Sequence, residues 1–434
     1  MPTNHIAHEF SNQPRKTCLA TLILGISLAV SAPVQAQSED KEPPNEVGMQ
    51  GGTIEIEELA TLEFPWGMAI LPGNRMLITE KPGNLRVWSD GELSDPVKGV
   101  PEVHYEGSGD QGGLLDVILD PEFDSNNRIY LSYTEAADKQ PEDLRDTKDV
   151  RFADYIDTSR STLRGGAVAR ATLDGNQLKD VEVIWRQEPK TIGRGHFGHR
   201  MVFGPDDKLF IMSGDRMRFE PAQNLNTNLG KVIRINRDGS NPEDNPSFDE
   251  EDARGDIWSY GHRNILAAAF DPETDKLWTF EMGPLGGDEV NLIEKGKNYG
   301  WPTVSNGAQY NRDPIPGHPG TDEFEDPIRT WTPVVSPSGA MFYDGTLIPE
   351  WQGSLLVGGL SSKSIVRLEL DDERIAVEER IDMQRRIRDL KQAPDGSIYA
   401  LVDAEEGKLL RLIPERTDAG RPVAAPEAEE DAQN

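Results

Sequence analysis

One histidine, His196, stands in a sequence context suited to proton transfer. It lies in the segment GRGHFGHRMVFGPDD, between a glycine-rich loop and an apolar stretch that predicts a strand. An imidazole changes its charge near neutral pH, so a histidine at this position is a candidate general base. His199 follows three residues later, but on a strand this spacing turns the two rings to opposite faces, which disfavours a zinc site. An ordinary packing role for His196 is the alternative.

Three arginines stand where strands are expected to begin or end. Arg263 and Asn264 follow a predicted strand that begins near Ile257, and Arg386 and Arg388 lie in a later strand. Residues two apart on a strand share a face, so Arg386 and Arg388 are predicted to point the same way. Guanidinium groups bind carboxylates through two parallel hydrogen bonds, which suits an anionic ligand. Ion pairs with the abundant Asp and Glu residues are the alternative.

The segment 281–302 is rich in oxygen donors. Gly283 and Pro284 can present backbone carbonyls, Glu289 a carboxylate, and Tyr299 a further carbonyl. Hard oxygen ligands of this kind suit calcium better than a transition metal.

Two other side chains are candidates for ligand contact. Gln111 opens the segment GDQGGLLDVILDPEF and can offer hydrogen bonds. Tyr310 lies in a long loop, residues 303–330, where an aromatic ring can stack on a flat ligand or a sugar. For each residue alone, packing is the commoner role.

A recurring phrase predicts the elements that position these residues. It consists of an apolar pair, a turn built on Pro, Asp, Gly or Asn, and an alternating strand. Its copies begin at Met68, Val117, Met201, Ala268, Met341 and Leu390. A spacing of about 50 to 85 residues suits four-stranded blades. We therefore predict an all-β, six-bladed β-propeller in which loops from every blade surround one mouth. A large sandwich or a β-solenoid is the alternative.

Charge and composition exclude several classes of function. The chain carries 45 Lys and Arg against 76 Asp and Glu, a formal net charge of −31. Such a surface repels nucleic acid and anionic lipid, so neither is an expected partner. An anionic ligand would need a locally basic pocket. The one cysteine, Cys18, lies in the segment that we expect to be removed, which excludes disulfides and thiolate chemistry in the mature chain.

The ends of the chain have their own compositions. Residues 1–36 have a basic start, an apolar run and small residues before a cleavage position, as in a signal peptide. This predicts a periplasmic or secreted protein without a membrane span in its mature part. Residues 37–50 and 415–434 are polar and are predicted to be a flexible segment and a disordered acidic tail. The propeller is then assigned to residues 51–414.

Six motifs, in order along the chain, resemble the soluble quinoprotein glucose/sorbosone dehydrogenase family. They are DQGGLLDV, GHFGHRMVFGPD, NLGKVIRIN, IWSYGHRN, GDEVNLIEKGKNYGWP and RIRDLKQAPDG, and the similarity runs from about Phe64 to about Ile413. Within the family the chain is most similar to the aldose sugar dehydrogenases that depend on pyrroloquinoline quinone. The resemblance implies a six-bladed propeller that holds this quinone and calcium and oxidises the C1 hydroxyl of aldoses to lactones.

The resemblance also implies roles for individual residues. It assigns His196 as the base and Arg263 as the group that stabilises charge developing on the cofactor. Its implied cofactor contacts are Gln111, Asn264, Tyr310, Arg386 and Arg388. The calcium ion that bridges the cofactor would meet the carbonyls of Gly283 and Pro284, and Glu289 and Tyr299 match a second, structural calcium site.

Three positions depart from the family pattern. Leu266 replaces a glutamine of many members, Met282 replaces a common Gln or His, and Ser361 stands where the family has a lysine. We include Ser361 among the cofactor contacts, together with Lys363, because strand alternation would return a residue two places later to the same side.

The departures motivate two other functions. One is a non-catalytic propeller that binds a carbohydrate or a protein, and the other is a calcium-dependent sugar lactone hydrolase. The preferred sugar and the electron acceptor (a quinone, a cytochrome or a dye-like molecule) are not determined by the sequence. Both a monomer and a homodimer remain compatible with it.

Overall fold

A computed structural model of the chain describes residues 43–140 and 162–415. The predicted signal peptide, part of the segment 37–50, and the tail after Glu415 lie outside the described residues. Within them the one α-helix is the short α1 (Phe123–Asn126), and the 3-10 turns are η3 (Glu220–Ala222) and η4 (Pro349–Trp351). No helix of this part of the chain has the length and apolar character needed to cross a membrane.

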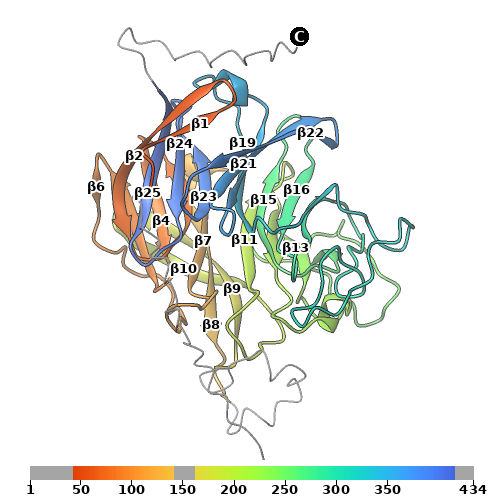
Figure 1. Ribbon diagram of the computed structural model, residues 1–434. Coiled ribbons are helices and arrows are strands. Elements are labelled where there is room, and N and C mark those ends of the chain that lie inside the picture. Colours follow the sequence, from red (N-terminus) through yellow and green to blue (C-terminus); the bar gives the residue numbers. More distant parts are fainter. Residues whose placement is uncertain (1–42, 141–161, 416–434) are drawn as a thin grey trace, which may run out of the picture. The chain divides into compact units, whose positions relative to one another are not determined.

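The strands form six antiparallel sheets, which are the blades of a propeller (Figure 1). Five blades each contain four consecutive strands. The first blade consists of β3 (Pro65–Leu71), β4 (Arg75–Glu80), β5 (Asn84–Ser89) and β6 (Glu92–Leu93). The second consists of β7 (Leu114–Leu119), β8 (Arg128–Ala136), β9 (Arg164–Asp174) and β10 (Gln177–Arg186). The third consists of β11 (Gly198–Phe203), β12 (Leu209–Ser213), β13 (Lys231–Ile235) and β14 (Ile257–Tyr260).

The remaining blades follow in chain order. The fourth consists of β15 (Ile265–Phe270), β16 (Leu277–Glu281), β17 (Asp288–Ile293) and β18 (Arg329–Trp331). The fifth consists of β19 (Pro337–Phe342), β20 (Leu355–Gly359), β21 (Ser364–Asp371) and β22 (Arg374–Asp382). The sixth joins both ends of the domain in the order β23 (Ile387–Gln392), β24 (Ile398–Val402), β25 (Gly407–Pro414), β2 (Gly52–Leu62) and β1 (Glu46–Met49).

The sixth blade closes the ring. Strand β2 pairs with β25 in antiparallel register, so the orange-red start and the blue end of the domain lie side by side (Figure 1). Strand β1 then pairs with β2, with Val47 opposite Ile54. The prediction of a flexible segment over residues 37–50 is therefore wrong for residues 46–49. Their alternation of exposed and buried side chains allows Val47 to pack in the core of the closing blade.

The first strand of each blade lies at the centre of the ring. Strands β3, β7, β11, β15, β19 and β23 contact one another in this cyclic order. Each of the six repeated phrases contains the later part of one of these inner strands and the strand that follows it. The prediction of an all-β, six-bladed propeller is thus confirmed.

Packing between blades forms the core. The second strand of a blade is buried on both faces, as in β12, whose five residues are all buried. Apolar clusters join each blade to the next; in one of them Leu77 of the first blade packs with Leu131 of the second. Burial of such side chains is the main favourable contribution to the stability of the ring.

A buried ionic network ties the inner strands together. The guanidinium of Arg200 lies 3.1 Å from a carboxylate oxygen of Asp116 and 3.2 Å from one of Asp389. Its charged end also lies over the ring of Trp66, at 4.3 Å. These residues come from four different blades, so the network fixes the relative positions of their inner strands.

Candidate active site

A cavity of about 210 Å³ lies where the inner strands begin. All six blades contribute to its wall. The lining residues are Trp66, Lys81, Gln111, Phe197, Gly198, Leu266, Met282, Ser336, Leu360, Ser361, Arg386 and Arg388. Inner strands start at the cavity, and the antiparallel second strands end there. Residues at the starts of inner strands and at the ends of second strands therefore line it.

Hydrogen bonds fix His196 on two sides. The residue is buried just before β11, and its backbone N–H donates to Gln111 Oε1 at 2.8 Å. Its ring Nδ1 lies 2.7 Å from Asp215 Oδ1. Because an ionised carboxylate only accepts hydrogen bonds, the imidazole proton lies on Nδ1 and Nε2 keeps its lone pair. His196 and Gln111 were predicted as site residues from the sequence, whereas Asp215 was not.

The protonation states of this pair suit proton acceptance. Burial and the charge of Arg263 lower the pKa of His196 below its ordinary value, although Asp215 acts in the opposite direction. Burial opposes the ionisation of Asp215, yet His196 and Arg263 hold the pKa of this carboxyl below its ordinary value. The imidazole is therefore neutral and the carboxylate charged at neutral pH.

Aromatic side chains support Asp215. Trp301 donates from its indole nitrogen to Asp215 Oδ2 at 2.8 Å and stacks on Phe219 at 5.3 Å. Trp301 is buried, so its contact is with the carboxylate and the neighbouring rings. The backbone N–H of Asp215 also donates to the carbonyl of Arg263 at 2.8 Å, which links the third and fourth blades.

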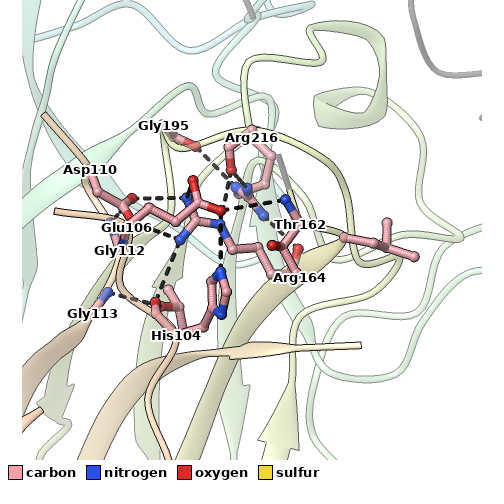
Figure 2. A network of polar contacts seen from close by, with 12 residues as sticks. His104, Glu106, Asp110, Gly112, Gly113, Thr162, Arg164, Gly195 and Arg216 are labelled. Atoms are coloured by element: carbon pink, nitrogen blue, oxygen red, sulfur yellow. Dashed lines mark hydrogen bonds and ion pairs between the residues drawn. The ribbon is translucent and has the colours of Figure 1, made fainter. Parts of the chain in front are cut away.

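A buried ion-pair network holds the backbone beside His196 (Figure 2). Arg164 binds both carboxylate oxygens of Asp110, at 2.7 and 3.0 Å. Arg216 donates to the carbonyls of Arg164 and Gly195, each at 3.0 Å. Asp110 directly precedes the glutamine that binds His196, and Gly195 directly precedes His196 itself. The network therefore joins the two segments that carry this contact.

Arg263 is positioned by its neighbours in the fourth blade. It donates to the carbonyl of Met282 at 2.7 Å and to the Tyr310 hydroxyl at 2.9 Å. Its backbone N–H donates to Glu281, a buried carboxyl whose pKa is raised to about 8 by burial. Asn264 is also buried, and neither atom of its amide has a hydrogen-bond partner in the described part of the chain.

Arg386 lies just before β23 and Arg388 lies within it, and both guanidinium groups reach the same carboxylate. Both pair with Asp403, at 2.7 Å for Arg386 and 2.9 Å for Arg388. Burial opposes the ionisation of Asp403, but the two arginines hold its pKa well below the ordinary value. Asp403 is thus a fixed counter-ion that leaves the cavity wall with excess positive charge.

The predicted ligands of the bridging calcium lie beside the cavity. Gly283 and Pro284 follow Met282, and among the described residues neither of their carbonyls accepts a hydrogen bond. The carboxylate of Asp288 is occupied by backbone N–H groups of Gly283, at 2.9 Å, and Ser336, at 2.6 Å. Loop 283–287 therefore has a fixed shape and carbonyl oxygens that remain available.

Glu289 and Tyr299 are buried and do not line the cavity. Glu289 lies 3.5 Å from the ring nitrogen of His318, and burial raises the pKa of its carboxyl. Tyr299 stacks on His262, with ring centroids 4.7 Å apart. No group of three or more His, Cys, Asp or Glu suited to a metal ion occurs in the described residues. The bridging site predicted from the sequence uses the carbonyls of Gly283 and Pro284, and the predicted structural site uses the Glu289 carboxylate and the Tyr299 carbonyl.

The structure separates Ser361 from Lys363. Both residues are exposed, but Ser361 lines the cavity and Lys363 does not. Residues 360–363 form a bend between β20 and β21, and Lys363 has a positive φ of 52°. The strand alternation from which we predicted Lys363 does not apply in a bend, so that argument is wrong.

The site residues that were not predicted from the sequence have similar places in the repeat. Lys81, Asp215, Glu281 and Asp403 all lie at or just after the end of the second strand of a blade. Each stands at the end of a repeated phrase, in the segments MLITEK, FIMSGD, LWTFE and IYALVD. This shared position is the signal that could have identified them.

Comparison with known proteins agrees with this arrangement. A family described as glucose/sorbosone dehydrogenase matches residues 62–411. The chain is 38% identical to the aldose sugar dehydrogenase YliI of Escherichia coli, over 83% of this chain and 93% of that protein. It is 30% identical to quinoprotein glucose dehydrogenase B of Acinetobacter calcoaceticus, over 80% and 84% of the two chains.

A solved structure shows the same similarity in three dimensions. The aldose sugar dehydrogenase from Streptomyces coelicolor, in its form with bound pyrroloquinoline quinone, superposes with a TM-score of 0.66. It is 25% identical, with 86% of this chain and 99% of that chain covered. The fold, the matched motifs and these similarities agree: the chain belongs to the glucose/sorbosone dehydrogenase family.

Proposed function

We propose that the protein is a pyrroloquinoline quinone-dependent dehydrogenase that oxidises the C1 hydroxyl of aldoses to lactones. The observation that carries this proposal is the hydrogen-bonded pair of His196 and Asp215 beside a cavity lined by Lys81, Arg386 and Arg388. A base and a cluster of cations are what hydroxyl deprotonation and an anionic cofactor require. Relatives named as a quinoprotein and as a quinone-bound enzyme support the same assignment.

The residues present fit a flat, anionic and carbonyl-bearing group. Buried atoms without a hydrogen-bond partner in the described residues include both amide atoms of Asn264, Nε of Arg263 and Nε of Arg388. Buried polar atoms of this kind normally have partners, so the nitrogen donors are suited to the oxygens of a ligand and the amide oxygen of Asn264 to an N–H or O–H group. Gln111, Asn264, Ser361, Arg386 and Arg388 would hold the quinone. When bound, it supplies a two-electron acceptor for the hydride of the sugar.

His196 performs the proton transfer in this proposal. Nε2 accepts the proton of the C1 hydroxyl, and Asp215 stabilises the resulting imidazolium through the proton on Nδ1. Gln111 fixes the backbone of His196 and so the direction of its ring. As this proton leaves, the hydride on C1 departs with its electron pair and the C1–O bond becomes a carbonyl.

Arg263 provides positive charge where negative charge develops. Its guanidinium lies over the rings of Trp301 at 5.3 Å and Tyr310 at 5.8 Å, which keep it oriented and partly exclude water. A preoriented cation in such surroundings stabilises an oxyanion more strongly than it would in water. The cations that face the cavity also offset the repulsion that a net charge of −31 would impose on an anionic cofactor.

We also propose calcium as a cofactor and export as the fate of the chain. The carbonyls of Gly283 and Pro284 would bind an ion that bridges the protein and the quinone, and Glu289 with the Tyr299 carbonyl would bind a structural ion. Export to the periplasm or the medium rests on the composition of residues 1–36.

One experiment tests the function directly. The purified protein is mixed with calcium and pyrroloquinoline quinone, and reduction of an artificial dye is followed with a panel of aldoses. The proposal expects aldose-dependent reduction that requires the quinone. Absence of both dye reduction and quinone binding would instead support a non-catalytic binding propeller, and cleavage of sugar lactones without quinone would support a hydrolase.

A further inference from the structure

Lys81 is a buried cation in the wall of the cavity. It follows β4 and is 7% exposed. It lines the cavity together with Arg386 and Arg388, which come from a different blade. Its ammonium lies 5.5 Å from the centre of the Phe64 ring and 5.2 Å from that of Tyr105, and it donates to the backbone carbonyl of Asp110. The side chain is thus held in place by contacts of its own.

The pairing of Lys81 differs from that of the two arginines. Arg386 and Arg388 share the carboxylate of Asp403. Among the described residues no carboxylate oxygen lies within ion-pair distance of the Lys81 ammonium, and the carbonyl of Asp110 is its one hydrogen-bond acceptor. A lysine ammonium has three hydrogens to donate, and a buried charge is costly unless it is paired. Its unpaired hydrogens and its place in the wall indicate an oxygen that enters with a ligand.

We propose that Lys81 binds the anionic cofactor directly, by an ion pair between its ammonium and a carboxylate or carbonyl oxygen of the quinone. The identity of the ligand rests on the function proposed above. The position of Lys81 in the cavity wall is observed independently of that function. In this arrangement the cofactor is held between cations of two blades, Lys81 of the first and the arginine pair of the sixth. Lys81 then supplies the ammonium contact that we had predicted for Lys363.

The charges around Lys81 make the contact sensitive to pH. Burial and the nearby Arg388 lower the pKa of Lys81 to about 8, and Arg386 acts in the same direction, whereas Asp403 and Asp110 oppose them. The neighbouring Tyr105 has a pKa raised to about 12 by burial, so it stays neutral while Lys81 titrates. Lys81 is therefore mainly charged at neutral pH and loses its charge as the pH rises through about 8. Affinity for an anion should fall over the same range.

Binding of free pyrroloquinoline quinone, measured by equilibrium dialysis in the presence of calcium, tests the proposal without requiring turnover. The variants are Lys81→Met, which removes the charge, and Lys81→Arg, which keeps it at all accessible pH values. Lys98→Met is the control because Lys98 is an exposed lysine, in the segment between the first and second blades, that does not line the cavity. Thermal melting of each protein without ligand reports on folding.

At neutral pH we expect Lys81→Met to bind the quinone about 10- to 100-fold more weakly than the wild type, as for loss of one charge-assisted hydrogen bond. Lys98→Met should match the wild type. As the pH rises through about 8, the wild type should lose affinity, whereas Lys81→Arg should retain it. This difference between lysine and arginine at one position is not expected from a merely structural role.

The outcomes separate the two proposals. If the wild type and Lys81→Met bind the quinone equally well, the role of Lys81 is refuted and the proposed function stands. If Lys81→Met does not fold, the comparison of the wild type with Lys81→Arg decides, and equal loss of affinity with rising pH refutes the role. If the wild type binds no quinone at any pH, both this role and the proposed function fail.

Discussion

Replacement of Asp215 by asparagine tests the proton-transfer pair most directly. The change keeps the size of the side chain and exchanges one oxygen for an NH₂ group. In the native protein Oδ1 accepts from His196 and from the backbone N–H of Met217, and Oδ2 accepts from Trp301. Every contact of this buried carboxylate is therefore with a donor.

The asparagine amide cannot satisfy all three donors. The indole of Trp301 and the backbone N–H of Met217 can only donate, and they meet different oxygens, so in either orientation one of them faces the NH₂ group. When the amide oxygen turns toward Trp301, Nδ1 of His196 has to accept from the NH₂ group, which places the imidazole proton on Nε2 and removes the lone pair needed for the C1 hydroxyl. The N–H of Met217 also loses its acceptor, at a cost of about 1–3 kcal/mol.

The expected effect is a large loss of rate with little loss of binding. A base held in the wrong tautomer loses the contribution of general-base catalysis, about 10²- to 10⁴-fold in kcat, or about 3–5 kcal/mol in activation free energy. Asp215 does not line the cavity, so quinone affinity should change little. Stopped-flow reduction of the bound quinone by an aldose measures the rate, and equilibrium dialysis measures the affinity.

Asp256 provides a matched control. It is also a buried carboxylate of the third blade, and it accepts from the indole of Trp185 at 2.9 Å. It does not line the cavity. Asp256→Asn should resemble Asp215→Asn in stability but retain the rate. A wild-type rate for Asp215→Asn, or equal losses in both variants, would refute the assigned role of Asp215.

Three further predictions follow from the same structure. Because the pKa of His196 is lowered and the base must be neutral, the rate of quinone reduction should be constant around neutral pH and fall only below about pH 6.5. Stopped-flow measurements over a range of pH test this, and a rate that already falls with decreasing pH above about 6.5 would contradict the assignment. Leu410→Ala, at a fully buried position of the closing blade, should lower the free energy of unfolding by about 2–5 kcal/mol in urea titrations, and a change below about 1 kcal/mol would argue against β25 as part of the core. Removal of calcium by a chelator should lower the melting temperature and weaken quinone binding, and unchanged melting and binding would argue against Gly283, Pro284 and Glu289 as ligands.

Much of the fold could be predicted from the sequence because the evidence for it is local and repeated. Each of the six copies of the strand–turn–strand phrase has an apolar face that must be covered. A ring of blades covers all six faces. The same phrases marked the inner strands, and Gln111, Arg386 and Arg388, which stand before or at the start of two of these strands, line the cavity. The closure by β1 and β2 was missed, because pairing of Ile54 with Pro414 joins residues from opposite ends of the domain.

Residue types and their places in the repeat were thus set by the sequence, but the direction of individual side chains was decided by the tertiary structure. Each inner strand has a register irregularity near its start, such as the shift between Ile387 and Asp389, and an irregularity of this kind re-aims side chains. Strand alternation failed at Lys363 for a different reason, because residues 360–363 form a bend between β20 and β21. The partners Asp215 and Lys81 emerged only when separate blades met, because contacts between blades leave no period in a single sequence.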